Sequence, residues 1–268
     1  MFKCVDVSLQ IGKAHLLNNI NFEFARNKIT AILGANGAGK SSLLKVLLHQ
    51  HKASRGEVLF DEIALADQSL STLAKARAYV AQKQFINLNL KVFEYLLLAR
   101  QHINEDMDMA TDLVSASAHE YGITKLLNHD LTAVSGGELQ LIEFTRAYLQ
   151  LADLSQTASN TLNNKCLLLD EPASALDIKQ TQHLYTYIQR FKNLGGTVIL
   201  VDHDINTMAV IADDIVMMKG GEVMASGEVK QVFTQSAINQ CFDIQGQLLL
   251  PNTTHSASHA IFHPQITQ

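Results

Sequence analysis

Residues 34–41 read Gly-Ala-Asn-Gly-Ala-Gly-Lys-Ser, and the interpretation of the whole chain starts from this stretch. It fits the pattern G-x-x-x-x-G-K-[ST] at every fixed position. The short apolar run Lys28–Leu33 precedes it, and apolar residues recur at helical spacing over Ser41–His49, which follows. The sequence therefore predicts a strand, a glycine-rich turn and a helix in direct succession, the setting in which this pattern binds phosphate.

The residue types of this loop suit a phosphate chain. Glycines let the backbone fold around phosphate so that successive N–H groups point at its oxygens, and the helix N-terminus adds partial positive charge. Lys40 would reach the β- and γ-phosphates of a nucleoside triphosphate, and the Ser41 hydroxyl would coordinate Mg²⁺. The predicted nucleotide-binding residues are Gly34, Ala35, Asn36, Gly37, Ala38, Gly39, Lys40, Ser41 and Ser42.

A second apolar run, Cys166–Leu169, ends in two adjacent carboxylates, Asp170 and Glu171. In a parallel sheet, residues at the carboxyl ends of strands face the ligand crevice. Asp170 is therefore placed to hold Mg²⁺ through its waters, and Glu171 to polarise an attacking water. A solvated strand end would explain an isolated Asp-Glu pair equally well, but after a phosphate-binding loop the pair indicates triphosphate hydrolysis.

Strand-like runs alternate with helical patterns along the chain, which predicts an α/β fold with a largely parallel sheet. Residues 2–24 alternate apolar and polar residues around Gly12, as an antiparallel edge does. From about residue 85 to 150 the apolar residues recur at helical spacing with few β-branched residues, so we predict an inserted all-helical subdomain. Core and subdomain together form one domain over residues 1–250.

Two polar stretches stand apart from this pattern. Residues 153–165 are rich in Ser, Thr and Asn and predict an exposed loop. Residues 251–268 predict a flexible tail. His255, His259 and His263 lie four residues apart in it, and on a helix they could bind a metal or haem, but Pro264 and the Ser/Thr-rich context argue against a helix.

Composition excludes several classes of protein. Among the 268 residues, 47% are hydrophobic and 18% are charged, so the chain can bury a sizeable core. The net charge is −5, which argues against nucleic acid as the main partner. No apolar run approaches the roughly 18 residues of a membrane-spanning helix, so we expect any membrane role to come through a partner.

Further motifs occur in order around these two. Gln82 ends a Tyr-Val-Ala-Gln run, residues 134–138 read Val-Ser-Gly-Gly-Glu, residues 174–177 read Ser-Ala-Leu-Asp, and His203 follows a late strand. With this set the chain resembles the ATP-binding subunit of an ABC transporter over roughly residues 1–245. The resemblance implies a P-loop NTPase core with an antiparallel β edge and the helical insertion, which is the ABC ATPase cassette.

The resemblance also implies a role for each motif in a head-to-tail homodimer that closes on two ATP molecules. The signature of one subunit would cap the γ-phosphate held by Lys40 of the other, and Asp177 would belong to the loop at the dimer contact. The implied signature residues are Ser135, Gly136, Gly137 and Glu138. The implied catalytic residues are Glu171, His203 and Gln82. The implied Mg²⁺ ligands are Ser41, Gln82 and Asp170.

Such a subunit would lie peripherally at the cytoplasmic face of the inner membrane, dock on integral membrane permease subunits beside Gln82, and serve a periplasmic or extracellular substrate-binding protein indirectly. The chain looks most like the subunits of haem, ferric-siderophore and cobalamin importers, and its insert at 153–165 is similar to that of haem-importer ATPases. Haem import is the first expectation. A ferric-siderophore or cobalamin importer is the alternative, and a soluble non-transport ABC ATPase is an alternative of another class.

Three positions depart from the pattern of the family. Val134 replaces the usual Leu at the start of the signature, and Glu138 replaces the usual Gln at its end. Ile11 stands where the family commonly stacks an aromatic residue on adenine, so the contact with the base would be apolar only. Base selectivity is therefore open.

Overall fold

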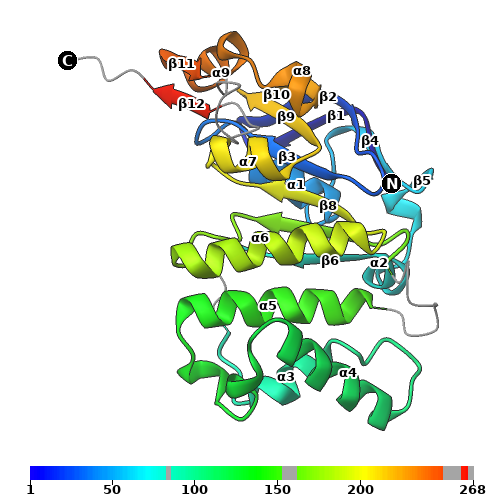
Figure 1. The fold of residues 1–268 in the computed structure, drawn as a ribbon. Coiled ribbons are helices and arrows are strands. Elements are labelled where there is room, and N and C mark those ends of the chain that lie inside the picture. Colours follow the sequence, from blue (N-terminus) through cyan, green and yellow to red (C-terminus); the bar gives the residue numbers. More distant parts are fainter. Residues whose placement is uncertain (83–85, 153–161, 250–260, 265–268) are drawn as a thin grey trace. The chain divides into compact units, whose positions relative to one another are not determined.

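The computed structural model describes residues 1–82, 86–152, 162–249 and 261–264 (Figure 1). The chain divides into two compact units, which are described one at a time. The first combines residues 1–67 with residues 199–268, and the second comprises residues 68–198. No helix in the described part of the chain is long and apolar enough to cross a bilayer.

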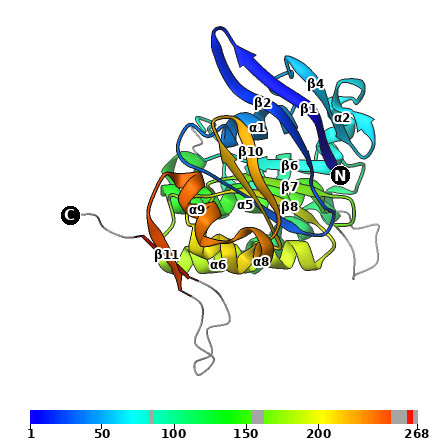
Figure 2. The same ribbon diagram turned by 90° about the horizontal axis from the view of Figure 1, so that it is seen from above.

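The first unit contains an antiparallel four-stranded sheet in the order β2-β1-β4-β5 (Figure 2). Burial alternates along the start of β1, where Phe2 and Cys4 are buried and Lys3 and Val5 are half-buried. This alternation is typical of a sheet with one covered face. The predicted antiparallel edge is thus confirmed. The strands are β1 (Phe2–Ile11), β2 (Ala14–Glu23), β4 (Arg55–Phe60) and β5 (Ile63–Ala64).

The same unit contains a second, mainly buried set of strands. β3 (Ile29–Leu33) pairs in parallel with β9 (Asp214–Lys219), and β10 (Glu222–Glu228) pairs antiparallel with β9. On its other side β3 neighbours β8 (Thr197–Val201), whose last three residues belong to this unit. All five residues of β3 are buried, as expected of a strand covered on both faces. The helices are α1 (Lys40–Leu47), α7 (Ile205–Ile211), α8 (Val229–Val232) and α9 (Gln235–Phe242), with a 3₁₀ turn at Leu65–Asp67.

The C-terminal region differs from the expected flexible tail at one point. β11 (Gly246–Leu249) pairs antiparallel with β12 (Ile261–Pro264), and Phe262 is 2% exposed. The Asn206 side chain holds the backbone of Phe262: its Nδ2 donates to the carbonyl at 3.2 Å, and its Oδ1 accepts from the N–H at 2.7 Å. Ile261 and Phe262 form an apolar pair inside a polar stretch, and Asn206, which holds Phe262, is a distant partner that composition does not reveal. His255, His259 and the His263 side chain lie outside the described residues.

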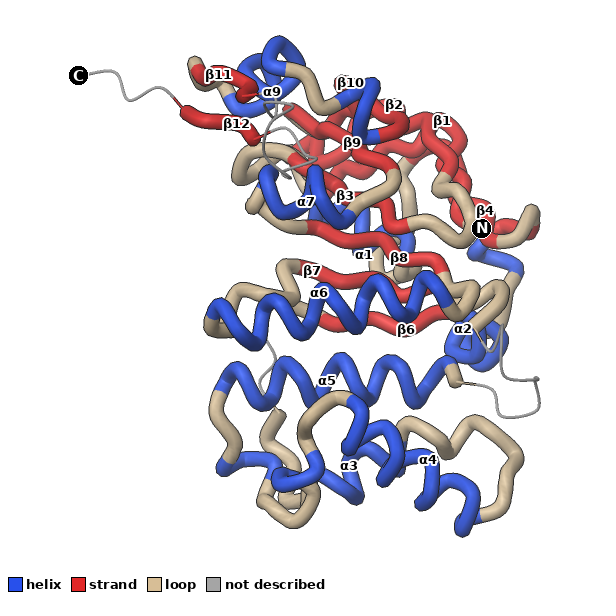
Figure 3. Tube along the Cα trace, viewed as in Figure 1, coloured by secondary structure: helices blue, strands red, loops and turns tan. Residues whose placement is uncertain are grey.

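The second unit is built on the parallel strands β6 (Arg77–Val80) and β7 (Cys166–Asp170), with helices around them (Figure 3). Residues 86–152, all of them described, form helices and turns without a strand, which agrees with the expected helical character of this region. The bounds 85–150 of a separate subdomain stay a prediction. The helices are α2 (Leu70–Ala76), α3 (Val92–Leu98), α4 (Met107–Glu120), α5 (Gly136–Leu151) and α6 (Ile178–Asn193), with 3₁₀ turns at Thr124–Leu126 and Leu131–Ala133.

Helix α5 joins the helical region of this unit to its strands. On one side α3, α4 and α5 share an apolar core in which Leu96, Val114, Ile142 and Leu149 are fully buried. On another side α5 lies against β6 (Figure 3). Any displacement of α5 would therefore disturb both layers, because close-packed side chains transmit strain rather than absorb it.

The polar insert at 153–165 lies mostly outside the described residues. Its last part, residues 162–165, leads into β7. Asn163 and Asn164 are exposed as predicted, whereas Leu162 is fully buried. The Leu162 N–H donates to the carbonyl of Leu194 at 3.1 Å, so this end of the insert is packed against the turn after α6.

Candidate active site

The phosphate-binding loop, residues 34–39, turns between β3 and α1 through conformations that glycine provides. Gly39 has φ 103°, in the left-handed region, and a Cβ there would lie 2.9 Å from the carbonyl oxygen of Leu16. At Gly34 a Cβ would lie 2.3 Å from the carbonyl oxygen of Met218. Since real Cβ contacts are longer, only glycine allows the loop to pack so closely against the neighbouring backbone.

Helix α1 begins without a side-chain cap. Its N-cap residue is Gly39, and its first turn carries no acidic residue. Helices α5, α6 and α7 are instead preceded by the N-cap residues Ser135, Asp177 and Asp204, whose side-chain oxygens accept hydrogen bonds from N–H groups of the first turns. No side chain of its own first turn neutralises the positive end of the α1 dipole, which suits this end to a bound anion.

Lys40 supplies the cation of the loop. It is 7% exposed, and its Nζ donates to the carbonyl oxygens of Gly34 at 2.6 Å and Ala35 at 3.1 Å. Loop carbonyls thus satisfy the buried ammonium in this conformation, and phosphate oxygens could replace them as stronger, charged acceptors. Ser41 is exposed and Ser42 is half-buried.

His203 belongs to the same unit and follows β8 in a tight turn. The buried Asp202 holds this turn, because its Oδ1 accepts from the N–H of His203 at 2.7 Å and from that of Asp204 at 3.1 Å. The His203 side chain is exposed at the carboxyl end of the strand. The turn therefore fixes the backbone of the histidine and leaves the residue exposed.

The second unit brings two predicted residues into contact. Gln82 Nε2 donates a short hydrogen bond to Glu171 Oε2, although the residues are 89 positions apart. Strand pairing explains the contact, since Val80 of β6 lies opposite Leu169 of β7, and the segments that follow these two strands leave the sheet at the same edge. Glu171 has φ 47°, a left-handed conformation that is unusual for a residue with a side chain.

Tyr79 is a residue of this site that the sequence analysis missed. Asp170 is 7% exposed at the end of β7, and the Tyr79 hydroxyl makes a side-chain hydrogen bond with it. Burial, together with the negative charge and hydrogen bond of Asp170, raises the pKa of Tyr79 to about 12. The phenol therefore stays protonated beside the carboxylate. Only the pairing of β6 with β7 reveals this neighbour.

The signature residues form the start of α5. The Ser135 N–H and hydroxyl each donate to Glu138 Oε2 at 2.8 Å, and the Glu138 N–H donates to Ser135 Oγ at 3.3 Å, which completes a capping box. These bonds to the carboxylate lower the pKa of Glu138. A Cβ on Gly137 would lie 3.1 Å from the Ala175 carbonyl, so the signature packs beside the loop that leads to Asp177.

The predicted site residues fall into two groups. The phosphate-binding loop and His203 belong to the first unit, and Gln82, Asp170, Glu171, the signature and Asp177 belong to the second. Ile11 lies in the first unit at the end of β1, where its side chain is 46% exposed. Within the described residues, no group of three or more His, Cys, Asp and Glu side chains is arranged to hold a metal ion.

A buried strand that runs through a glycine loop into an uncapped helix defines a P-loop nucleotide-binding protein. Comparison with known proteins narrows this class. The model of the ABC transporter family matches residues 17–174, and the chain belongs to that family. As an ABC ATPase, it binds and hydrolyses ATP.

Curated relatives match nearly the whole chain. The hemin import ATP-binding protein HmuV of Methylobacillus flagellatus is 32% identical over 252 residues, which cover 93% of this chain and 91% of the relative. The protein of the same name from Pseudoalteromonas translucida is 33% identical over 258 residues, which cover 95% and 96%.

Solved structures support the fold. A metal-chelate type ABC transporter in an inward-facing conformation aligns with a TM-score of 0.79 at 22% identity, covering 99% of this chain and 97% of that one. The cbiO1 protein of Clostridium perfringens, part of the transporter complex cbiONQ, aligns with a TM-score of 0.73 at 25% identity, covering 89% and 92%. The predicted fold class is confirmed.

Lys40→Ala tests the loop. We expect ATP affinity to fall by about 100-fold, because the variant loses the ammonium that would bind the phosphates. The fold should persist, as judged by circular dichroism, since the loop carbonyls to which Lys40 donates become accessible to water. Lys45→Ala, at an exposed site in the last turn of the same helix, is the control and should bind ATP normally. Near wild-type binding by Lys40→Ala would show that the loop is not the phosphate site.

Glu138→Ala tests the capping box. Because the folded-state pKa of Glu138 is lowered, its carboxylate stabilises the fold above the ordinary glutamate pKa, and this stabilisation is lost as pH falls through the lowered value. We expect the variant to be less stable by about 1 kcal/mol at neutral pH and equal to wild type in strong acid. Urea unfolding at a series of pH values measures both. Glu138→Gln, which keeps the acceptor oxygen, should retain much of the stability without its pH dependence, and a pH-independent deficit in Glu138→Ala would contradict the assignment.

Proposed function

We propose that the protein is the ATP-hydrolysing subunit of an ABC importer and powers haem uptake through a separate membrane permease by ATP-driven closure of a homodimer. The observation that carries the hydrolytic part is the bond between Gln82 and Glu171. This bond holds the side-chain amide of Gln82, whose oxygen can bind a metal ion or water, against the carboxylate of Glu171, which follows the buried strand β7.

Glu171 would act as the general base. Its carboxylate is oriented by Gln82, and a carboxylate held in this way can take a proton from an attacking water. His203, exposed on its fixed turn, would contact the γ-phosphate and the same water. Lys40 and the N-terminal N–H groups of α1 would bind the phosphates and stabilise the charge that develops during hydrolysis.

The predicted Mg²⁺ ligands fit the chemistry of that ion. Ser41, Gln82 and Asp170 offer hydroxyl, amide and carboxylate oxygens, the hard donors that Mg²⁺ prefers. The hydrogen bond from Tyr79 would fix the orientation of the Asp170 carboxylate. When bound, the ion would neutralise charge on the β- and γ-phosphates.

The signature supports a homodimer. Ser135 and Gly137 lie at the N-terminus of a 16-residue helix, where a hydroxyl and backbone N–H groups can bind an anion. In the single chain, the Ser135 hydroxyl donates a hydrogen bond to the Glu138 carboxylate. A γ-phosphate held by Lys40 of a second subunit would take that position when two subunits close head to tail, with Asp177 at the contact between them.

The family resemblance predicts permease docking beside Gln82; we propose that an apolar pocket of the second unit, lined by residues between Leu90 and Ala110, is the docking place. Its volume is about 360 Å³, and Leu98 and Met107, which are 43% and 64% exposed, lie at its surface. The exposed carboxylates of Glu94, Asp106 and Asp108 lie in or beside its lining segments. Cytoplasmic loops of membrane proteins carry excess Lys and Arg. A basic loop with an apolar side chain therefore complements the pocket, and such docking would hold the subunit at the cytoplasmic face of the membrane.

The relatives support haem as the cargo, because proteins at 32% and 33% identity over most of the chain are named hemin import ATP-binding proteins. The subunit itself would not touch haem. A periplasmic binding protein would deliver it to the permease, and the chain would supply the free energy of ATP hydrolysis.

Glu171→Gln tests the general base. The amide keeps the size of the side chain but cannot take a proton, so we expect hydrolysis to fall by about 10²-fold while ATP binding persists. With ATP uncleaved, the variant should accumulate as a dimer in MgATP, which sedimentation velocity detects. Glu57→Gln, the same change at an exposed position of β4, should leave turnover unchanged. Unaltered turnover in Glu171→Gln would remove this residue from the mechanism.

Reconstitution tests the cargo. Proteoliposomes that contain the subunit with its permease and are supplied with the binding protein should take up hemin in an ATP-dependent manner. Complexes with Glu171→Gln give the leak rate. Uptake of a ferric siderophore or cobalamin without hemin uptake would assign the transporter to one of those cargoes instead.

A further inference from the structure

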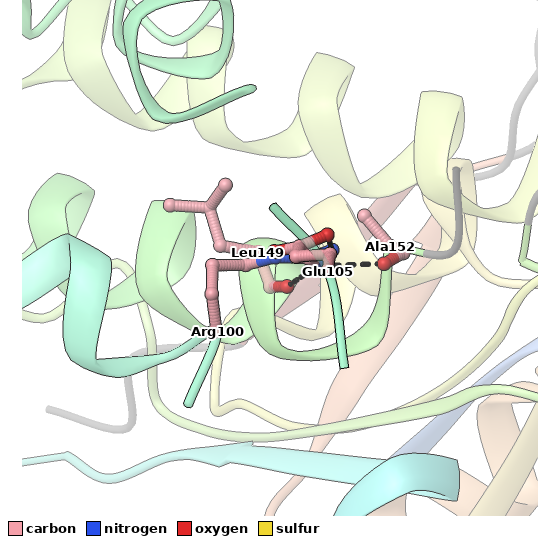
Figure 4. Close-up of polar contacts among 4 residues, drawn as sticks. All are labelled: Arg100, Glu105, Leu149 and Ala152. Atoms are coloured by element: carbon pink, nitrogen blue, oxygen red, sulfur yellow. Dashed lines mark hydrogen bonds and ion pairs between the residues drawn. The ribbon is translucent and has the colours of Figure 1, made fainter. Parts of the chain in front are cut away.

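Arg100 makes an unusual set of contacts in the second unit (Figure 4). It follows α3, and its side chain is 2% exposed. Nε and Nη2 donate to the two carboxylate oxygens of Glu105 at 2.7 and 2.5 Å. Nη1 donates to the backbone carbonyls of Leu149 at 2.5 Å and Ala152 at 2.6 Å. One guanidinium thus binds a carboxylate on one side and the end of another helix on the other.

These contacts cap α5 from outside. The last carbonyls of a helix lack partners within it, and a cation near them also interacts favourably with the helix dipole. The last turn of α5 carries no basic residue of its own. Arg100 supplies the cation from about 50 positions earlier in the chain, and its planar fork makes both sets of bonds at once, which a lysine ammonium does not reproduce.

The same arginine lines the apolar pocket. Arg100, Gln101, Ile103 and Glu105, in the turn between α3 and α4, contribute to its lining. This turn will be called the pocket wall, residues 99–106. A partner that fills the pocket presses on the pocket wall, and the Arg100 side chain connects the wall to the C-terminus of α5.

Helix α5 carries such a displacement to its other end. It is 16 residues long, or about 24 Å, and the signature residue Ser135 is its N-cap. A hydrogen-bonded helix of this length moves as a rod, so a shift or tilt at Leu149 also displaces Ser135.

We propose that Arg100 is a positioning residue that links the permease-binding pocket to the signature through α5. The link rests on the proposed function, since it gives the docked permease control over the group that closes on ATP. In the isolated subunit, Arg100 sets the position of the signature. In the transporter, it transmits occupation of the pocket to that position.

The first experiment uses the isolated subunit. Arg100→Lys is made in the Glu171→Gln background, and dimer association in saturating MgATP is measured by sedimentation. We expect the dimer affinity to fall by about 10-fold, while affinity for a fluorescent ATP analogue changes less than about twofold, because Lys40 is untouched. Arg190→Lys, at an exposed ion pair with Glu120 in the same unit, is the matched control. A loss of stability alone would lower the melting temperature without separating the dimer affinity from the affinity for the ATP analogue.

The second experiment uses the complex with its permease in lipid nanodiscs and wild-type Glu171. Arg100→Lys should co-purify with the permease but lose permease-dependent stimulation, measured as the ratio of stimulated to basal hydrolysis, by about 10-fold. Leu98→Glu and Met107→Glu report on docking itself and should fail to co-purify. If these two bind normally, the docking assignment is wrong, and the first experiment still decides whether Arg100 positions the signature.

Two results would overturn the proposal: an Arg100→Lys dimer affinity equal to that of its parent, or full stimulation by the permease. Should Arg100→Lys fail to fold, Glu105→Gln replaces it, because this change weakens the anchor of the guanidinium and leaves both carbonyls in place. We expect the dimer affinity of Glu105→Gln to fall by about threefold while its affinity for the ATP analogue stays nearly unchanged. Unchanged dimer affinity and unchanged stimulation in this variant would overturn the proposal equally.

Discussion

The structure depends on how each helix satisfies its first N–H groups. Helices α5, α6 and α7 do so with Ser135, Asp177 and Asp204, of which the first two are themselves predicted functional residues. Helix α1 begins at Gly39 and has no cap. Among these four helices, the starts of α5, α6 and α7 are neutralised by their own caps, whereas that of α1 retains its positive end for an external anion. Phosphate bound at that end would stabilise the folded chain as well as hold the nucleotide.

The acidic part of the site depends on strand pairing rather than on capping. Parallel alignment of β6 and β7 brings Gln82 to Glu171 and Tyr79 to Asp170 at one edge of the sheet. Each carboxylate thereby gains a neutral partner that donates to it without cancelling its charge. A lysine or arginine in either place would hold the carboxylate more strongly, but it would compete with a metal ion or a proton for the same oxygens.

Much of this arrangement could be predicted from the sequence, because its signals are local. The buried strands β3, β7 and β8, the glycine loop and the start of α5 each occupy one continuous stretch with a distinctive residue pattern. What escaped prediction were single contacts between distant segments: Tyr79 with Asp170, Asn206 with Phe262, and Arg100 with the end of α5. Such contacts follow from tertiary packing, and neither periodicity nor spacing encodes them.

The backbone at Glu171 has an evolutionary consequence. A side-chain-bearing residue in the left-handed region costs about 1 kcal/mol relative to glycine, and Glu171, at φ 47°, bears this cost at the position proposed for the general base. Random substitution under selection for stability alone would drift towards glycine or asparagine here. A lineage that lost its cargo but kept the protein as a nucleotide-binding scaffold would be expected to lose this glutamate early. With Glu171 as the proposed general base, the identity of the residue at this position would separate working ATPases from degenerate copies.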